Sequence, residues 1–126
     1  MISDPTILYE DSSFVAAVKP FGTICESGPF VESLREKLHC PSLYCVHRLD
    51  KVCGGLILFA KSTQASAAFS SLFASGGIAK TYLAVAEGVA EEVSGRMEDL
   101  LFHESGRNKT FVVDRVRKGV RSASLE

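Results

Sequence analysis

A histidine, an arginine and an aspartate stand close together in the middle of the chain, at His47, Arg48 and Asp50. They precede an apolar run at residues 55–61 whose length and composition are typical of a buried strand. A loop that leads into such a strand suits catalysis, because the rigid scaffold positions its side chains. A carboxylate there can act as a nucleophile, and a neighbouring guanidinium favours its ionised form. On residue types alone, an ordinary ion pair between Asp50 and Arg48 or Lys51 is the simpler interpretation.

Potential soft metal ligands gather in the same region and raise the alternative of a zinc-stabilised binding module. Structural zinc sites usually take ligand pairs spaced about two to four residues apart, and the chain has no Cys-x-x-Cys pair. Cys45 lies in an apolar run, where a free thiol packs as a small hydrophobic group. We therefore expect that the cysteines among the candidate ligands are buried thiols and that no metal binds here. The candidate ligands are His39, Cys40, Cys45, His47 and Cys53.

Two strands and a helix are predicted before this loop. Alternating apolar residues predict strands at 6–10 and 14–18, and residues 11–13 supply a polar turn. Pro20 ends the second strand, because proline cannot donate a hydrogen bond to a sheet. Apolar side chains at helical spacing then predict a helix that ends near residues 40–41. These side chains are Phe30, Val31, Leu34 and Leu38.

Behind the loop, the sequence predicts a buried strand at 55–61 and then a second helix. Ser62 is the expected N-cap of this helix, and Gly76 is expected to end it. Its apolar stripe consists of Ala65, Ala68, Phe69, Leu72 and Phe73.

Further strands are predicted at 78–87 and 109–116, and Lys118 and Gly119 predict a hairpin turn into a final strand that has barely begun. The predicted fold class is α+β, a mixed, largely antiparallel sheet with two short helices. A half-made final hairpin leaves an open sheet edge. We therefore expect a partner, self-association through that edge, or a longer chain.

Length and composition are typical of one globular domain over residues 1–126. Hydrophobic residues make up 46% and charged residues 23% of the 126 residues. With a net charge of −1, the chain has no overall positive potential that would attract polyanions. The chain has no apolar run of the roughly 20 residues that span a bilayer, and its first five residues lack secretory features. We expect a soluble, cytoplasmic protein that does not bind membranes.

Three motifs, in order along the chain, resemble those of one enzyme family. The run from His47 to Asp50, followed by Gly-Leu at 55–56 and Phe-Ala-Lys at 59–61, resembles the catalytic motif of RluA-type RNA pseudouridine synthases. Residues 7–11 and 18–22 resemble the opening strand pair of that family, which ends in a Lys-Pro-x-Gly turn. Residues 79–84 resemble its Lys-x-Tyr motif. The resemblance implies a pseudouridine-synthase-like fold.

This resemblance also implies an isomerase that detaches a uridine of rRNA or tRNA at N1 and rejoins it to its ribose through C5. It implies that no metal and no other cofactor takes part. Asp50 is the implied nucleophile or base, and its point of attack stays open between ribose C1′, uracil C6 and a ribose proton. Tyr82 is implied to stack under the base and to take the C5 proton, unless it is an ordinary strand aromatic. The implied substrate-binding residues are His47, Arg48, Lys51 and Lys80.

The chain departs from the family pattern directly after Asp50. Where the family usually has Arg, an acidic residue, Thr and Ser, this chain has Lys, Val, Cys and Gly at 51–54. Lys51 cannot stack or pair bidentately as a planar guanidinium does. A later basic motif, which pairs with the catalytic aspartate in the family, has no match before residue 126. We therefore expect a partial catalytic domain. The alternative is a catalytically incompetent half-domain that binds RNA or protein.

Basic residues gather late in the chain and outnumber the acidic Glu104 and Asp114 there. Such a stripe is able to follow an RNA backbone, and its binding would then depend on salt. A solvated strand face is the alternative interpretation. The basic residues are Arg107, Lys109, Arg115, Arg117, Lys118 and Arg121.

Overall fold

The computed structural model describes residues 4–126. Met1, Ile2 and Ser3, part of the segment searched for a targeting signal, lie outside the described residues. The contacts divide the chain into two compact units, one ending at Tyr82 and the other spanning Leu83–Glu126. The single domain over residues 1–126 stays a prediction. None of the helices in residues 4–126 is long and apolar enough to cross a membrane.

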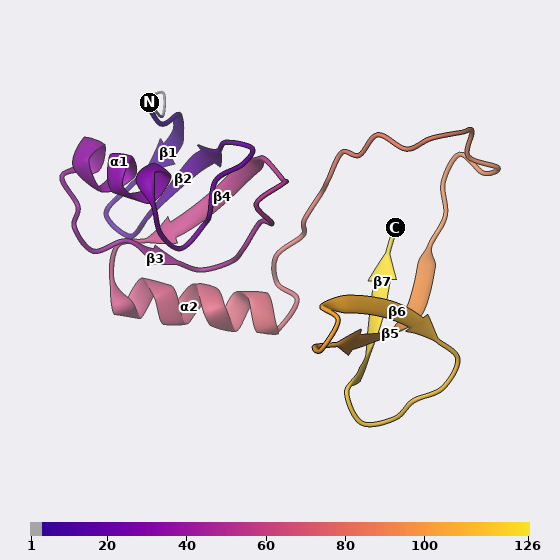
Figure 1. Ribbon diagram of the computed structural model, residues 1–126. Helices are drawn as coiled ribbons and strands as arrows, with labels where there is room; N and C mark the ends of the chain where they lie inside the picture. The colour runs from indigo at the N-terminus through magenta and orange to yellow at the C-terminus, as the bar shows by residue number, and fades with distance from the viewer. Residues whose placement is uncertain (1–3) are drawn as a thin grey trace. The chain divides into compact units, whose positions relative to one another are not determined.

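The first unit contains a four-stranded antiparallel sheet in the order β1-β2-β4-β3 (Figure 1). Its strands are β1 (Ile7–Glu10), β2 (Phe14–Lys19), β3 (Tyr44–Cys45) and β4 (Gly55–Ala60). The central strands β2 and β4 pair over their whole length, from Phe14 opposite Ala60 to Lys19 opposite Gly55. The predicted turn at 11–13 is confirmed, because the Asp11 carboxylate accepts the N–H groups of Ser13 and Phe14.

Two helices, α1 (Pro29–Leu38) and α2 (Thr63–Ala74), complete the first unit and confirm the two predicted helices. The Ser62 hydroxyl accepts the N–H of Ala65 as the N-cap of α2, and Gly76 follows that helix with φ 70°. Helix α1 contributes buried side chains to the core, which continues into β2 and β4. The core consists of Val15, Ala17, Cys25, Phe30, Val31, Leu34, Leu43, Ile57 and Phe59.

Helix α2 is less buried than its apolar stripe predicts. None of its side chains is fully buried, and Leu72 is 46% exposed. Phe69 packs edge-on against Phe14, with ring centroids 5.3 Å apart. Strand β4 is also less buried than predicted. The side chains of Ile57 and Phe59 are buried, whereas that of Leu56, on the other face, is 53% exposed. The prediction of a buried strand at 55–61 is therefore wrong at Leu56.

The second unit contains a three-stranded antiparallel sheet in the order β6-β5-β7. Its strands are β5 (Met97–Glu104), β6 (Lys109–Val113) and β7 (Val120–Leu125). The α+β class with antiparallel pairing is confirmed, although the strands form two sheets. The sequence did not predict β5, whose apolar run is only three residues long and is flanked by charges.

The predicted hairpin at Lys118 and Gly119 is wrong, because β7 pairs with β5 and not with β6. Residues 114–119 connect β6 to β7 and therefore cross over β5, which lies between these two strands. Gly119 has φ +88°, and a Cβ added to it would lie 3.3 Å from Cε2 of Phe102. The left-handed backbone lets the connection pass close to Phe102, and β7 is a complete strand of six residues.

The predicted strand at 78–87 is also wrong. These residues have no regular secondary structure, and the side chains of Leu83 and Val85 are fully exposed. Alternating apolar residues favour a strand only where a neighbouring strand completes the hydrogen bonds, and no described strand pairs with this segment.

Candidate active site

Asp50 lies in the loop of residues 46–54, which joins β3 to β4, and its side chain is exposed. The N–H of Cys53 donates to the Asp50 carbonyl oxygen at 2.9 Å and closes a turn over residues 50–53. Within residues 4–126, the Asp50 carboxylate has no hydrogen-bond or ion-pair partner. The main chain at Asp50 is therefore held, while its carboxylate faces solvent and is accessible to a reactant.

A buried thiol fixes the residue before Asp50. The Cys25 thiol donates to the Leu49 carbonyl oxygen at 3.0 Å, and its sulfur accepts the Leu49 N–H at 3.1 Å. Cys25 is only 2% exposed and belongs to the hydrophobic core. One core side chain thus satisfies both main-chain groups of Leu49, and this pair of bonds fixes the direction in which the chain enters Asp50.

A buried lysine fixes the other side of the loop. Lys19, with 0% exposure, donates from Nζ to the Cys53 carbonyl oxygen at 2.6 Å and to the Pro20 carbonyl oxygen at 3.1 Å. The N–H of Gly22 donates to the Lys51 carbonyl oxygen at 2.7 Å. The turn that follows β2 therefore holds the loop at two places, one on each side of residue 52.

The main chains of these two turns lie against each other at Gly54. A Cβ added there would lie 3.3 Å from the Lys19 carbonyl oxygen and 3.4 Å from the Phe21 nitrogen. A larger residue at this position would push the loop away from the turn after β2. This contact gives a physical reason for glycine at position 54.

His47 connects the start of the loop to the sheet. Its Nε2 accepts the N–H of Leu58, on β4, at 3.0 Å, so that the ring replaces a main-chain acceptor where β3 ends. The ring lies 5.1 Å from that of Phe73 on α2. Burial, and secondarily the positive charge of Lys80, lowers the pKa of His47. A neutral imidazole is the form that accepts the Leu58 N–H.

The thiol of Cys45 holds the same stretch of chain, because it donates to the His47 carbonyl oxygen at 2.9 Å. Burial raises the pKa of Cys45 to about 11, which keeps the thiol protonated and able to donate at neutral pH. The expected full burial of the thiols holds for Cys25, whereas Cys40, Cys45 and Cys53 are only partly buried. Across residues 4–126, no group of three or more His, Cys, Asp or Glu side chains is arranged to hold a metal ion.

Arg48 forms its ion pair with Glu26, at 3.1 Å from Nε to Oε1, and both side chains are largely exposed. Among the described residues, neither Arg48 nor Lys51 pairs with Asp50. The simple loop ion pair suggested by the residue types is therefore absent. An exposed pair of this kind contributes little stability.

The remaining predicted site residues follow helix α2. Lys80 and Tyr82 are both exposed, and Tyr82 retains 58% of its accessible surface. The positive charge of Lys80 contributes to the lowered pKa of His47, after burial. The structure thus brings His47, Arg48, Asp50 and Lys51 together in one loop, and Tyr82 lies on a separate exposed segment.

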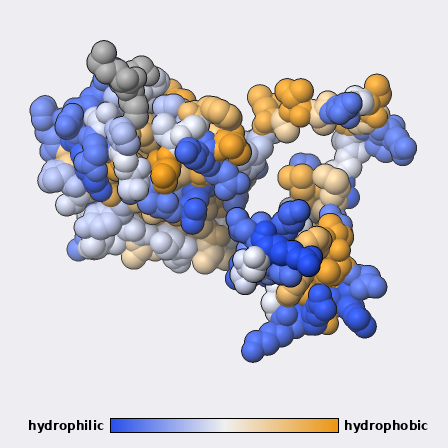
Figure 2. Space-filling view, in the orientation of Figure 1, coloured by the Kyte–Doolittle hydropathy of each residue, from blue (hydrophilic) through white to orange (hydrophobic). Residues whose placement is uncertain are grey.

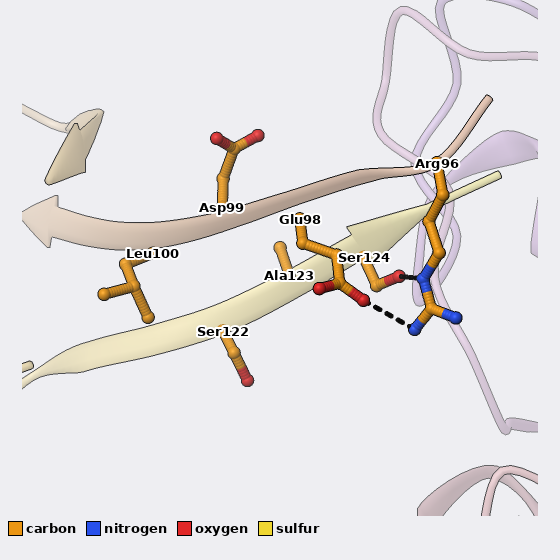
Figure 3. A pocket seen from close by; sticks show the side chains of 7 residues that line it. All are labelled: Arg96, Glu98, Asp99, Leu100, Ser122, Ala123 and Ser124. Carbon is orange, nitrogen blue, oxygen red and sulfur yellow. Dashed lines mark hydrogen bonds and ion pairs between the residues drawn. The ribbon is translucent and has the colours of Figure 1, made fainter. Parts of the chain in front are cut away.

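A shallow pocket on the second unit contains none of these residues (Figure 3). It lies over the pairing of β5 with β7 and is lined by residues of those strands together with Arg96. The guanidinium of Arg96 donates from Nε to the Ser124 hydroxyl at 3.1 Å and pairs with Glu98 at 2.8 Å. The pocket holds none of the residues of the predicted catalytic motif, so it is not a candidate for the chemistry.

The family model for RNA pseudouridylate synthase matches residues 13–124, which include the loop of Asp50 and every strand except β1 and the last residue of β7. The chain belongs to this family. A relative from Haemophilus influenzae, an uncharacterized RNA pseudouridine synthase, is 36% identical over 83 residues, which cover 63% of this chain and 37% of the relative. The dual-specificity RNA pseudouridine synthase RluA of Vibrio cholerae is 38% identical over 96 residues, 72% of this chain and 39% of the relative.

Solved structures show the same fold. The human RNA Pseudouridylate Synthase Domain Containing 4 superposes with a TM-score of 0.76 and 22% identity, over 94% of this chain and 51% of the human chain. The chain spans less than two-fifths of the length of the two bacterial relatives, 37% and 39%. The comparisons thus establish the fold of this chain and its membership of the pseudouridylate synthase family.

Sequence reasoning missed the groups that hold the pseudouridylate synthase loop in place. Lys19 and Cys25 bind its main chain, Glu26 pairs with Arg48, and Phe73 packs on His47. The sequence contains a signal for the role of Lys19, because a lysine at the end of a buried strand needs hydrogen-bond acceptors for its ammonium group. Nothing in the spacing of Cys25 indicates its hydrogen bonds to Leu49.

Proposed function

We propose that this chain forms part of an RNA pseudouridine synthase in which Asp50 supplies the catalytic carboxylate. One observation carries the proposal: the Asp50 side chain is exposed on a loop whose main chain is held on both sides by Cys25 and Lys19. A held main chain of this kind limits where a nucleophilic side chain can reach, which reduces the cost of orienting it toward a substrate. The family match over residues 13–124 supports the same chemistry.

The proposed reaction exchanges one bond of the nucleoside for another. The bond between uracil N1 and ribose C1′ breaks, a bond between C5 and C1′ forms, C5 loses its proton and N1 gains one. Asp50 assists the cleavage, either by attack on C1′ or C6 or by removal of a ribose proton. Tyr82 is the candidate acceptor for the C5 proton. The reaction is an isomerisation and consumes no cofactor.

A uridine within structured RNA must leave its stack to reach Asp50, at a cost of a few kcal/mol. We assign the binding of the displaced nucleotide and its phosphates to His47, Arg48, Lys51 and Lys80. Arg48 and Lys51 are exposed beside Asp50, and the Glu26 pair holds the Arg48 guanidinium at the loop. The neutral ring of His47 acts mainly by shaping the loop through Leu58.

The proposed substrate is rRNA or tRNA. The matched relatives include a tRNA pseudouridine synthase C from Vibrio vulnificus and a ribosomal large subunit pseudouridine synthase C from Rickettsia bellii, so both RNA classes occur in their names. The proposal includes a cytoplasmic location, where these RNAs are made. It also includes self-association through an open edge of the second sheet, whose outer strands are β6 and β7.

The test uses RNA labelled with tritium at uracil C5, because formation of the C5 glycosidic bond releases that hydrogen. We expect release with the unaltered chain and none with Asp50→Asn. Asp114→Asn, which removes an exposed carboxylate from the second unit, serves as the matched control and retains release. Release that persists in Asp50→Asn would contradict the assigned role. Absence of release from the folded, unaltered chain would favour the alternative of a binding half-domain.

A further inference from the structure

One face of the second sheet combines aromatic rings with surrounding positive charge. Phe102 on β5 and Phe111 on β6 are opposite each other in the antiparallel register, so both side chains lie on the same face. Phe111 is 41% exposed. Figure 2 shows hydrophobic and hydrophilic residues side by side on the surface of this unit. An exposed aromatic ring on a sheet face is a suitable platform for a nucleic-acid base.

Positive side chains reach this face from two directions. Lys109 lies two residues from Phe111 along β6, hence on the same face, and is exposed. The connection of residues 114–119 crosses the face and places the Arg117 guanidinium carbon 4.7 Å from the centre of the Phe102 ring. Lys118 follows on the same exposed connection. The cation–π contact holds Arg117 beside the aromatic pair without neutralising its charge.

Negative charge on this face is already partly compensated. Glu104, which is opposite Lys109, pairs with Arg107 at 3.7 Å between Nε and Oε1. Among the described residues, Arg117 and Lys118 have no ion pair with an acidic side chain. The connection also contains the exposed Asp114, which Arg115, Arg117 and Lys118 outnumber. Positive charge thus exceeds negative charge next to an exposed ring, whereas the whole chain has a net charge of −1.

The opposite face of the same sheet differs in composition. Val112 is the neighbour of Phe111 on β6 and points to that other face, opposite Leu101 and Arg121 across the sheet. It is 66% exposed but has no aromatic ring. The two faces thus offer a matched comparison within one strand, between an exposed ring and an exposed aliphatic side chain.

We propose that the face bearing Phe102 and Phe111 binds a single-stranded segment of the RNA, with a base stacked on Phe111 and phosphates bound by Lys109, Arg117 and Lys118. The inference rests on the proposed RNA substrate and adds a second contact surface to it. Stacking on a ring tolerates any base, so this surface adds affinity without reading sequence. Its contribution depends on salt through the phosphate contacts.

The test measures binding of the full chain to a fluorescein-labelled, unstructured 12-nucleotide RNA by fluorescence anisotropy. We expect Phe111→Leu to weaken binding about tenfold and Phe111→Tyr to retain it, because only the ring stacks. Val112→Ala, on the other face, is the matched control and leaves binding unchanged. Arg117→Gln reduces the slope of log affinity against log salt by about 0.7, the value for one contact to a single strand.

Other outcomes would overturn the inference. One such outcome is an equal loss of binding in Phe111→Leu and Val112→Ala. A second is that the folded chain shows no measurable binding. A third is that a 12-base-pair RNA duplex binds as tightly as the single strand and that Phe111→Leu does not weaken this binding. Circular dichroism spectra establish that each variant is folded. Asp50→Asn separates this inference from the proposed function, because it abolishes tritium release and leaves anisotropy binding intact. Binding that requires Phe111 without tritium release would support the surface while refuting the catalytic proposal.

Discussion

The loop of Asp50 and the segment of Tyr82 contain the two side chains proposed for the chemistry, yet the first unit holds them very differently. The loop is held by core residues on each side of Asp50, at Leu49 and at Cys53. The segment after α2 has no regular structure, and Tyr82 is 58% exposed. The comparison shows that this unit fixes the main chain on both sides of Asp50 by its own contacts. Placement of the tyrosine against a substrate requires contacts made outside this unit, with RNA as the proposed source.

The largest effect is expected from Lys19→Met, which removes one of the holds on the loop. The Cys53 carbonyl oxygen loses its donor, and an unsatisfied buried acceptor costs about 1–3 kcal/mol. We expect the free energy of unfolding in urea to fall by that amount and the amide hydrogen of Cys53 to exchange faster.

Lys61→Met is the matched control for Lys19→Met. Lys61 donates to the Asp11 carbonyl oxygen and pairs with Glu10, so it holds the turn between β1 and β2 instead. Its substitution should accelerate exchange near residues 11–14 and leave the amide of Cys53 unchanged. Equal changes at both places in both variants would show that the loop is not held separately by Lys19.

A smaller effect is expected from pH through His47. Its pKa is lowered in the folded protein, mainly by burial, so the unfolded chain takes up the proton first as pH falls. The free energy of unfolding should therefore decrease from pH 7.5 to 5.5, with the loss beginning near the unfolded pKa of about 6.5.

His47→Gln should flatten that dependence, because a glutamine amide is neutral throughout and its oxygen is able to accept the Leu58 N–H. His39→Gln, at an exposed position after α1, is the control and should leave the pH dependence in place. An unchanged slope in His47→Gln would contradict the role of a neutral ring at the start of the loop. Urea titrations at four pH values provide the measurement.

The smallest effect on stability is expected from Tyr82→Ala. The side chain is exposed and contributes no buried contact, so the free energy of unfolding should change by less than about 0.5 kcal/mol. Tritium release, in contrast, should be strongly reduced if Tyr82 takes the C5 proton. A large loss of stability in this variant would remove the contrast between the two regions.

The local elements of the first unit were predictable because their signals lie within short stretches of sequence. The Ser62 cap and the Asp11 turn depend on hydrogen bonds to residues two or three positions away. The failures depend on distant partners. Residues 78–87 have a strand pattern without a described neighbour, and the pairing of β7 with β5 skips the nearer β6. Within the site, the motif identified Asp50, but the bond from Cys25 to Leu49 joins residues 24 positions apart.

The order β6-β5-β7 also constrains how the second sheet assembles. Strands β6 and β7 are both antiparallel to β5 and therefore parallel to each other, on its two sides. The hairpin of β5 and β6 joins neighbours in sequence and closes a short loop, so it forms quickly. Strand β7 pairs with residues 18 to 28 positions earlier, from Phe102 opposite Val120 to Met97 opposite Leu125, and the connection passes close to Phe102. We therefore expect β7 to add after the hairpin, whereas the Arg117 contact with Phe102 lies on the connection and needs only the β5–β6 hairpin.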